Sequence, residues 1–376
     1  MDFHSKENHL LLNPKLKSEV RRSYEHAWTF ALTKKKLESH IAMATSGTTS
    51  DAGKLVLLSK NAFLESAKSV NRHLETSQQD IWLKALPEFH VGGLSILARA
   101  SLAGSKVFEY SDEKWNAQKF FEALVASRAT LISLVPTQIF DLLNLDLRAP
   151  KNLRAVLIGG AALSETVYHK TQELGWKLLP SYGMTETCSM IACSDGQTHE
   201  PKVLSHAKVR LGEGGQLQVS ASSLLTAYVL RQNETSYELV DPKYQDSESL
   251  SWFNTEDLAY VTDEHIQIIG RGDDFFKVGG EGVSLLRLEN VLAQLKLEMK
   301  PNYDLVLLVV PDERLGSRAD LLSTSKDISQ VQRFVDHFNE RVTGFERIRK
   351  IHLVNQIPRT DLGKVKRQEA LSIIDA

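Results

Sequence analysis

The chain has 376 residues, of which 42% are hydrophobic and 24% are charged, a composition typical of a globular protein of two or three domains. Its formal net charge of -2 gives no electrostatic reason to expect nucleic acid or an anionic membrane surface as a partner. The two cysteines, Cys188 and Cys193, have no further cysteines or histidine pattern near them, so neither a disulfide framework nor a zinc site is indicated.

The N-terminal segment, residues 1–22, scatters charge on both sides of a short apolar stretch and lacks the apolar core of a signal peptide. The sequence contains no uninterrupted apolar run of roughly 18 residues, the length needed to cross a bilayer. We therefore expect a cytoplasmic protein without stable membrane association. A homo-oligomer is left open.

From Ile41 onward, short apolar runs alternate with helical patterns. The runs IAMA, from Ile41, and LVLLS, from Leu55, precede a helical pattern over residues 61–74. The alternation continues through ATLISLV, LRAVLIGG and a helical spacing over residues 163–174. Strand, helix and strand in this order predict a parallel sheet covered by helices.

Residues 215–269 consist of short alternating segments such as GQLQVS and EHIQIIG, which predict a small antiparallel β unit. Beyond them come a helical pattern over 285–295, the apolar strand DLVLLVVPD, a helix over 328–342, the strand IHLVN and a closing helix. We predict an α/β protein with a large domain over residues 1–272 and a smaller α+β domain over residues 273–376.

The segment TSGTTS follows an apolar strand and precedes Lys54. Glycine lets backbone amides approach an anion closely, and hydroxyl groups can donate to phosphate oxygens. The spacing of a Walker A loop is absent, and a plain turn between strands is the alternative interpretation. The residues predicted to hold phosphates are Thr45, Ser46, Gly47, Thr48 and Thr49.

Six further segments follow this loop in order: LPEFHVGGL, LIGGAAL, SYGMTET, NTEDLAYV, GRGDDFFKVGGEG and PRTDLGKVKR. Together with TSGTTS they resemble the adenylate-forming superfamily of acyl-CoA synthetases, peptide-synthetase adenylation domains and luciferases, over residues 41–367. The resemblance implies a large N-terminal adenylation domain and a mobile C-terminal domain. It also implies an acid–thiol ligase that uses ATP, Mg²⁺ and coenzyme A and forms an acyl adenylate.

Within this resemblance, small residues let the backbone pass flat under the adenine ring. Tyr182 would stack on the base, Thr185 would contact the α-phosphate, and Glu186 would hold Mg²⁺ through a hard carboxylate oxygen. Taken alone, a residue such as Glu186 is more often a solvated charge at a helix start. The further residues assigned to nucleotide binding are Gly159, Gly160, Ala161, Ser181 and Gly183.

The resemblance also implies roles near the C-terminus. Asp257 would accept hydrogen bonds from the ribose hydroxyls with support from Arg271, and Lys364 would stabilise the charge that develops at the carboxylate and α-phosphate. Taken alone, a residue such as Asp257 is more often a turn cap, and one such as Lys364 a surface lysine. The C-terminal domain would rotate about Asp273 between the half-reactions and bring the CoA-channel residues into use, namely Gly279, Gly280 and Glu281.

The chain departs from the family pattern in three places. One extra residue precedes Lys54, so we expect hydroxyls and amides of the loop, more than Lys54, to hold the phosphates. Glu256 stands where a glycine is usual and adds a negative charge beside Asp257. Most of the family's segment upstream of the loop is missing, so we expect an abbreviated N-terminal subdomain.

Finer similarity points to the o-succinylbenzoate-CoA ligases of menaquinone synthesis, through SLVPTQIFDLL, AVLIGGAALSE, SYGMTET and FFKVGGEGV. Their acid has two carboxylates, one activated and one in need of a positive partner. The spacing from His90 to Arg99 resembles the position of that branch's arginine, whose guanidinium can bind a carboxylate bidentately. Ser95 faces the same way one helical turn earlier. His90 is either a pocket residue or a core histidine, and Arg99 either a ligand or a helix-surface arginine in an ion pair.

Two other functions are left open by the sequence. One is a CoA ligase for another aryl or short-chain acid, and the other is a non-catalytic relative that binds nucleotide or adenylate. Glu186, Asp257, Arg271 and Lys364 are all retained. A binding module would not need the lysine, which favours the enzyme.

Overall fold

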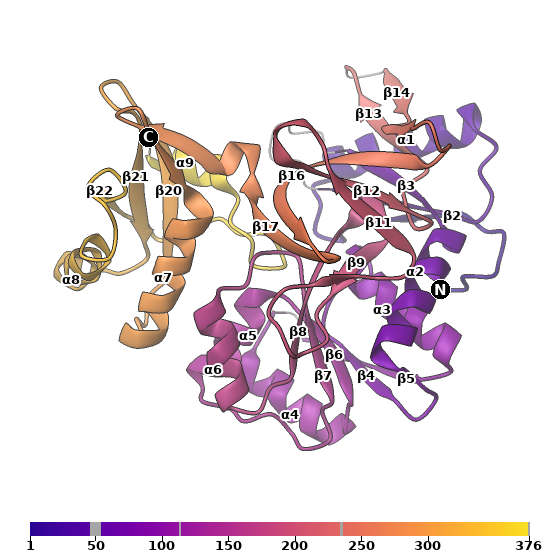
Figure 1. The fold of residues 1–376 in the computed structure, drawn as a ribbon, viewed down its shortest axis with the longest axis horizontal. Helices are drawn as coiled ribbons and strands as arrows, with labels where there is room; N and C mark the ends of the chain where they lie inside the picture. The colour runs from indigo at the N-terminus through magenta and orange to yellow at the C-terminus, as the bar shows by residue number, and fades with distance from the viewer. Residues whose placement is uncertain (46–53, 113, 234–235, 375–376) are drawn as a thin grey trace. The chain divides into compact units, whose positions relative to one another are not determined.

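The computed structural model describes residues 1–45, 54–112, 114–233 and 236–374. Figure 1 labels most of its helices and strands, and the chain falls into two compact units. The first unit comprises residues 1–160, 171–255 and 259–267, and the second comprises residues 161–170, 256–258 and 268–376. The domain boundary predicted between residues 272 and 273 stays a prediction.

The largest sheet has a parallel centre, as the alternation of strands and helices predicts. In this centre β5 (Lys106–Glu109), β4 (Ile81–Lys84), β6 (Leu131–Leu134), β7 (Ala155–Ile158) and β8 (Leu178–Met184) pair in parallel. Beyond β8 the sheet continues through β9 (Ser189–Cys193), β10 (Lys202–Val203), β17 (His265–Arg271), β16 (Ser251–Thr262), β12 (Gln216–Ala221) and β11 (Ala207–Leu211). β15 (Lys243–Gln245) pairs with β16. The pairing of β8 with β9 is antiparallel, so the chain turns back sharply after β8.

Helices cover the parallel strands. α2 (Lys60–Leu74) and α3 (Val91–Ala103) pack together and against β9, and Trp82, Leu131 and Leu157 share a core cluster with their apolar side chains. Successive side chains of a strand point to opposite faces of a sheet. The intervening residues therefore face the other way, toward α4 (Ala117–Ser127), which packs on β4 (Figure 1). Next to α4 lies α5 (Pro136–Asn144), and α6 (Glu165–Glu173) follows β7 in the chain.

A second sheet contains β1 (His9–Leu11), β2 (His40–Ala44), β3 (Leu55–Ser59), β13 (Ala227–Arg231) and β14 (Tyr237–Val240). α1 (Ser18–Lys34) packs on it through Tyr24, Ala27 and Ala31, which are spaced by three and four residues and so share one helical face.

This second sheet corrects two expectations. The runs IAMA and LVLLS pair antiparallel with each other and do not join the parallel sheet. Residues 215–269 do not form a separate β unit, because β13 and β14 belong to this sheet whereas the other strands extend the large one. Alternation within a segment shows that it is a strand, but the partner is chosen by contacts far away in the sequence.

The second unit contains a sheet of β19 (Glu281–Ser284), β18 (Phe275–Val278), β21 (Gly316–Ser323), β20 (Leu305–Asp312) and β22 (Ile348–Leu353). Its helices are α7 (Leu285–Met299), α8 (Ile328–Asn339) and α9 (Arg367–Ile374). The buried side chains of α8 follow the helical period and pack in the core of this unit: Val331, Phe334, Val335 and Phe338. The mixed α/β class is therefore confirmed.

In the part of the chain that the structure describes, no helix combines the length and the apolar character needed to cross a bilayer.

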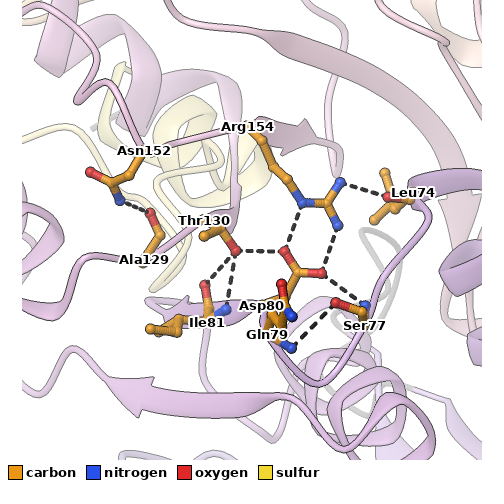
Figure 2. Close-up of polar contacts among 9 residues, drawn as sticks. All are labelled: Leu74, Ser77, Gln79, Asp80, Ile81, Ala129, Thr130, Asn152 and Arg154. Carbon is orange, nitrogen blue, oxygen red and sulfur yellow. Dashed lines mark hydrogen bonds and ion pairs between the residues drawn. The ribbon is translucent and has the colours of Figure 1, made fainter.

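A buried ionic network holds the amino ends of the parallel strands together (Figure 2). Asp80, 5% exposed, precedes β4 and accepts from Arg154 Nε at 2.7 Å and Nη2 at 2.9 Å. Thr130 Oγ1 and the amide of Ser77 also donate to this carboxylate, at 2.7 and 2.8 Å. Arg154 Nη1 donates to the carbonyl of Leu74 at the end of α2. One carboxylate thus joins three strand starts and a helix end.

We expect Asp80→Asn to lower the free energy of unfolding by about 3 kcal/mol near neutral pH, because it leaves Arg154 without its partner. Burial alone would raise the pKa of Asp80, but the hydrogen bonds from Arg154, Ser77 and Thr130 lower it below its ordinary value. A lowered pKa stabilises the fold above the unfolded-state pKa of about 4 and loses that effect as the pH falls below it. Urea unfolding at neutral and acid pH tests this.

The matched control for this prediction is Glu122→Gln, which changes an exposed carboxylate on α4. We expect a small effect that varies little with pH, because exposed polar pairs contribute little. A loss for Asp80→Asn that is as small as the control's, or that persists undiminished in acid, would contradict the role of the network.

Candidate active site

The segment SYGMTET forms the end of β8 and the sharp turn that follows it. The 3-10 turn η1 (Thr185–Thr187) leads the chain from β8 into β9. Thr187 is fully buried, and its hydroxyl lies 3.1 Å from the carbonyl oxygen of Met184 and 2.6 Å from that of Ser189. The amide of Met184 donates to the same hydroxyl at 3.0 Å. These bonds fix the turn that carries Thr185 and Glu186.

Glu186, the predicted metal ligand, is held at two points. Its side-chain Oε1 accepts from Tyr228 Oη at 2.9 Å, and its carbonyl accepts from the amide of Leu225 at 2.8 Å. Among the described residues there is no cluster of three or more His, Cys, Asp or Glu side chains. A single oriented carboxylate fits Mg²⁺, which proteins commonly bind through one or two carboxylates together with substrate phosphates.

Close packing requires glycine beside this turn. A Cβ at Gly183 would lie 2.1 Å from the carbonyl oxygen of Ser189, so the approach of β8 to β9 excludes any side chain there. A Cβ at Gly159 would lie 2.9 Å from Ser181 Oγ, and that hydroxyl donates to the carbonyl of Ile158 at 2.9 Å.

The structure therefore brings two of the predicted nucleotide-binding residues, Gly159 and Ser181, side by side. Gly160 is exposed and has φ 86°, in the region that favours glycine. Tyr182 follows Ser181 in the same strand, and Ala161 belongs to the second unit. Their contact with adenine stays a prediction.

The predicted phosphate loop is described only at its two ends. Thr45 directly follows β2, and Lys54 directly precedes β3. The amide of Thr45 donates to the carbonyl of Lys54 at 3.0 Å. Lys54 Nζ lies 5.0 Å from the centroid of the Tyr228 ring. The loop positions Ser46, Gly47, Thr48 and Thr49 lie outside the described residues, so their role stays a prediction.

The predicted ribose pair is formed inside the second unit. Arg271 Nε donates to Asp257 Oδ1 at 3.1 Å, and Asp257 is only 7% exposed. Glu256, the residue in place of the family's glycine, is exposed and lies 3.9 Å from Arg271 Nη1. Arg271 therefore faces both carboxylates, and the added charge of Glu256 is partly compensated. Asp273, the predicted hinge, lies in the 3-10 turn η3 (Gly272–Asp274).

Lys364 lies in a tight loop of the same unit. Thr360 and Lys364 pair across the loop, with an amide-to-carbonyl bond of 2.7 Å. Arg359 stabilises this loop through hydrogen bonds: two of its nitrogens donate to Asp304, and a third donates to the carbonyl of Gly363. Lys364 is exposed at the surface of this unit, and partial desolvation followed by the charges of Arg271 and Arg367 lowers its pKa below the ordinary value.

Arg99 is the most unusual of the predicted acid-binding residues. It is 1% exposed, it follows one helical turn after Ser95 on α3, and its Nη2 donates to Ser189 Oγ at 3.1 Å. None of the described residues pairs with its Nε or Nη1. Burial lowers the pKa of Arg99 to about 10, so the guanidinium is still charged near neutral pH. The alternative of a surface arginine in an ion pair is wrong.

Other residues near Arg99 complete this buried polar cluster. The Trp82 ring lies 6.0 Å from the guanidinium, and its Nε1 has no partner among the described residues. Both ring nitrogens of His206 are also buried and have no partner among the described residues. Burial, followed by the charge of Arg99, lowers the pKa of His206 to about 4. The cluster holds unpaired hydrogen-bonding groups and one net positive charge, which suits an anionic group.

The remaining predicted residues lie in ordinary local structure. His90 is the residue before α3, and its ring centroid lies 4.6 Å from that of Phe89. Ser95 donates to the carbonyl of Gly92 at 3.1 Å. The turn between β18 and β19 places the CoA-channel residues at the surface, with φ of 63° and 94° at its glycines: Gly279, Gly280 and Glu281. Their roles stay predictions.

The AMP-binding enzyme family matches residues 16–214, more than half of the chain. The chain belongs to the AMP-binding enzyme family.

Two curated relatives are similar to most of this family member. A 2-succinylbenzoate–CoA ligase of Listeria monocytogenes is 26% identical over 335 residues, which cover 87% of this chain and 68% of the relative. A 2-succinylbenzoate–CoA ligase of Staphylococcus epidermidis is 27% identical over 345 residues, covering 88% and 69%.

Solved structures are also similar to most of this chain. The o-succinylbenzoate CoA synthetase of Bacillus subtilis with its acyl-adenylate intermediate matches with a TM-score of 0.76 at 23% identity, covering 96% of this chain and 82% of that one. The same enzyme in complex with ATP and a magnesium ion matches with a TM-score of 0.70 at 25% identity, covering 88% and 69%. The adenylate-forming fold of this AMP-binding enzyme is therefore confirmed.

Several residues of the candidate site were missed by sequence reasoning. Thr187 fixes the η1 turn, Tyr228 holds Glu186, and the charge of Arg99 acts on His206. Thr187 could have been found within SYGMTET, because a hydroxyl in a tight turn often bonds to nearby backbone. Tyr228 and His206 give no local signal.

Proposed function

We propose that this chain is an ATP-dependent acid–CoA ligase that acts on 2-succinylbenzoate through an acyl adenylate. The observation that carries the choice of acid is the buried guanidinium of Arg99, which has two nitrogens unpaired among the described residues. An aromatic acid with two carboxylates can place one at the guanidinium and leave the other for activation. The relatives named 2-succinylbenzoate–CoA ligase, similar over 87% and 88% of this chain, support the same choice.

In the proposed first half-reaction the free carboxylate attacks the α-phosphorus of ATP and pyrophosphate leaves. The protein contributes positioning and charge stabilisation, because phosphoryl chemistry of this kind needs little covalent help. Glu186 would hold Mg²⁺, which supplies positive charge against the phosphate oxygens. Gly159, Gly160 and Tyr182 would hold the base, and Asp257 with Arg271 the ribose.

In the second half-reaction the thiol of coenzyme A attacks the acyl carbon, a thioester forms, and AMP leaves. We propose that Lys364 serves only the first half-reaction, that Asp273 is the hinge, and that Gly279 to Glu281 serve the second. A cytoplasmic location and a homo-oligomer also stay proposals.

A panel of acids tests this function through ATP-dependent pyrophosphate release, with CoA consumption measured in parallel. The informative acids are 2-succinylbenzoate and two analogues that each lack one carboxylate, 3-benzoylpropanoate and 2-butanoylbenzoate. We expect 2-succinylbenzoate to give the highest kcat/KM, with coupled CoA consumption. Higher activity with a simple monocarboxylic acid would contradict the substrate, and tight ATP binding without turnover of any acid would contradict the enzyme.

A further inference from the structure

Tyr228 connects two parts of the candidate nucleotide site. Its hydroxyl donates to Glu186 Oε1 at 2.9 Å, and the face of its ring carries Lys54 Nζ at 5.0 Å from the centroid. The side chain is buried, with 7% exposure. One aromatic residue therefore contacts both the end of the predicted phosphate loop and the predicted metal carboxylate.

Strand pairing places Tyr228 at this junction. β13 runs antiparallel to β3, with Tyr228 opposite Val56 and Val229 opposite Leu55, and Lys54 directly precedes β3. The segment leading into β13 also reaches the η1 turn, because the amide of Leu225 donates to the carbonyl of Glu186 at 2.8 Å. Both the backbone and the carboxylate of Glu186 are thus held from one strand, and a shift of β13 would move them together.

We propose that Tyr228 is a positioning residue for the metal: its hydroxyl fixes the Glu186 carboxylate for Mg²⁺ binding, and Lys54 fixes its ring. This inference rests on the proposed function, because it takes Glu186 as the metal ligand. It gives Lys54 a role distinct from that of a phosphate ligand.

The chemistry of the contact supports this role. A carboxylate oxygen that accepts from a phenol hydroxyl is oriented, and the second oxygen stays available to a hard cation. Hydrogen-bond partners of metal ligands generally contribute 10–100-fold to metal affinity. A lysine ammonium over the face of a tyrosine ring is attracted by the ring quadrupole, which restricts the ring to one orientation.

The test measures metal binding without turnover. Mn²⁺ serves as the probe for Mg²⁺, titrated by electron paramagnetic resonance against the full chain with the non-reactive nucleotide α,β-methylene-ATP. We expect Tyr228→Phe to weaken Mn²⁺ binding by about tenfold or more. Binding of the same nucleotide without metal should be unchanged, which also shows that the variant is folded.

Tyr237→Phe is the matched control. Tyr237 lies on the neighbouring strand β14, and its hydroxyl donates to the carbonyl of Ser23 at 3.2 Å. Its loss removes a tyrosine hydrogen bond in the same sheet without touching Glu186. Equal Mn²⁺ affinities for Tyr228→Phe, Tyr237→Phe and the parent chain would overturn the proposal.

Glu186→Gln separates this inference from the proposed function. If Glu186→Gln leaves Mn²⁺ binding intact, the metal ligand itself is misassigned and the positioning role of Tyr228 fails with it, whereas the ligase function is judged by the acid panel. If it abolishes Mn²⁺ binding while Tyr228→Phe does not weaken it, only the positioning role of Tyr228 fails.

The role of Lys54 is tested by a double-mutant cycle of Lys54→Met and Tyr228→Phe. If Lys54 acts through the ring, Lys54→Met weakens Mn²⁺ binding in the parent chain and adds little in the Tyr228→Phe background. If it instead weakens metal-free nucleotide binding equally in both backgrounds, Lys54 is a phosphate ligand and its positioning role is overturned.

Discussion

Replacing Lys364 with alanine is expected to abolish one half-reaction and spare the other. Pyrophosphate release from ATP and 2-succinylbenzoate should fall by about 10²–10³-fold, the usual loss when a group that stabilises developing charge is removed. Thioester formation from supplied acyl adenylate and CoA should be largely retained. The loop of Lys364 is held by Arg359 and Asp304, so loss of this side chain should not unfold it.

The comparison for Lys364→Ala is Lys366→Ala, two residues further along. Lys366 is exposed and pairs with Glu369 at 2.8 Å, so its loss should leave both half-reactions intact. Desolvation and the charges of Arg271 and Arg367 lower the pKa of Lys364. The parent enzyme should therefore lose adenylation as rising pH deprotonates the Lys364 ammonium group, and this loss should come at a lower pH than for an ordinary lysine. Equal loss of both half-reactions in Lys364→Ala would exclude a role restricted to adenylation.

The sequence predicted the elements well where their pattern is local. The helical spacing of Val331, Phe334 and Phe338 reflects one buried face, and α8 forms there. It ends at Asn339, short of the predicted residue 342. The end of a helix depends on tertiary contacts, which a local sequence pattern does not show. α7 conversely extends to Met299, beyond the predicted residue 295.

Strand partners could not be read in the same way. β3 and β13 are short, mostly buried apolar segments, but nothing within either segment shows that they pair across about 170 residues of chain. The parallel centre was predictable because a helix between two strands enforces a parallel crossover. Helix α1 gives β2 such a connection to β1, but none fixes the antiparallel pairing of β3 with β2 and β13, or of β13 with β14.

The residues of the candidate site also differ in whether a local sequence pattern reveals them. Asp257 and Arg271 could be assigned from short segments, and the structure brings them within 3.1 Å. Tyr228 contacts Glu186 from 42 residues away, and no spacing rule relates the two. The burial of Arg99 was also beyond sequence reasoning, since an arginine on an otherwise apolar helix can face solvent or core.

The acid specificity of the enzyme is expected to depend on Arg99. A buried guanidinium with unpaired nitrogens lowers the stability of a fold, so a charge of this kind needs a partner. Arg99→Met keeps the volume and removes the charge. The KM for 2-succinylbenzoate should then rise by about 10²-fold, because truncating one member of a buried charge pair generally costs 2–5 kcal/mol. Turnover of 3-benzoylpropanoate, which lacks the ring carboxylate, should change little.

Arg154 provides the contrast that makes the result decisive. Arg154 is saturated by Asp80 and the carbonyl of Leu74, so Arg154→Met should destabilise the fold and reduce activity with both acids alike. Arg99→Met should instead leave the acid-free protein at least as stable as the parent in urea, and 2-succinylbenzoate should no longer raise its Tm. If Arg99→Met behaves as Arg154→Met does, Arg99 is a structural residue and the second carboxylate is bound elsewhere.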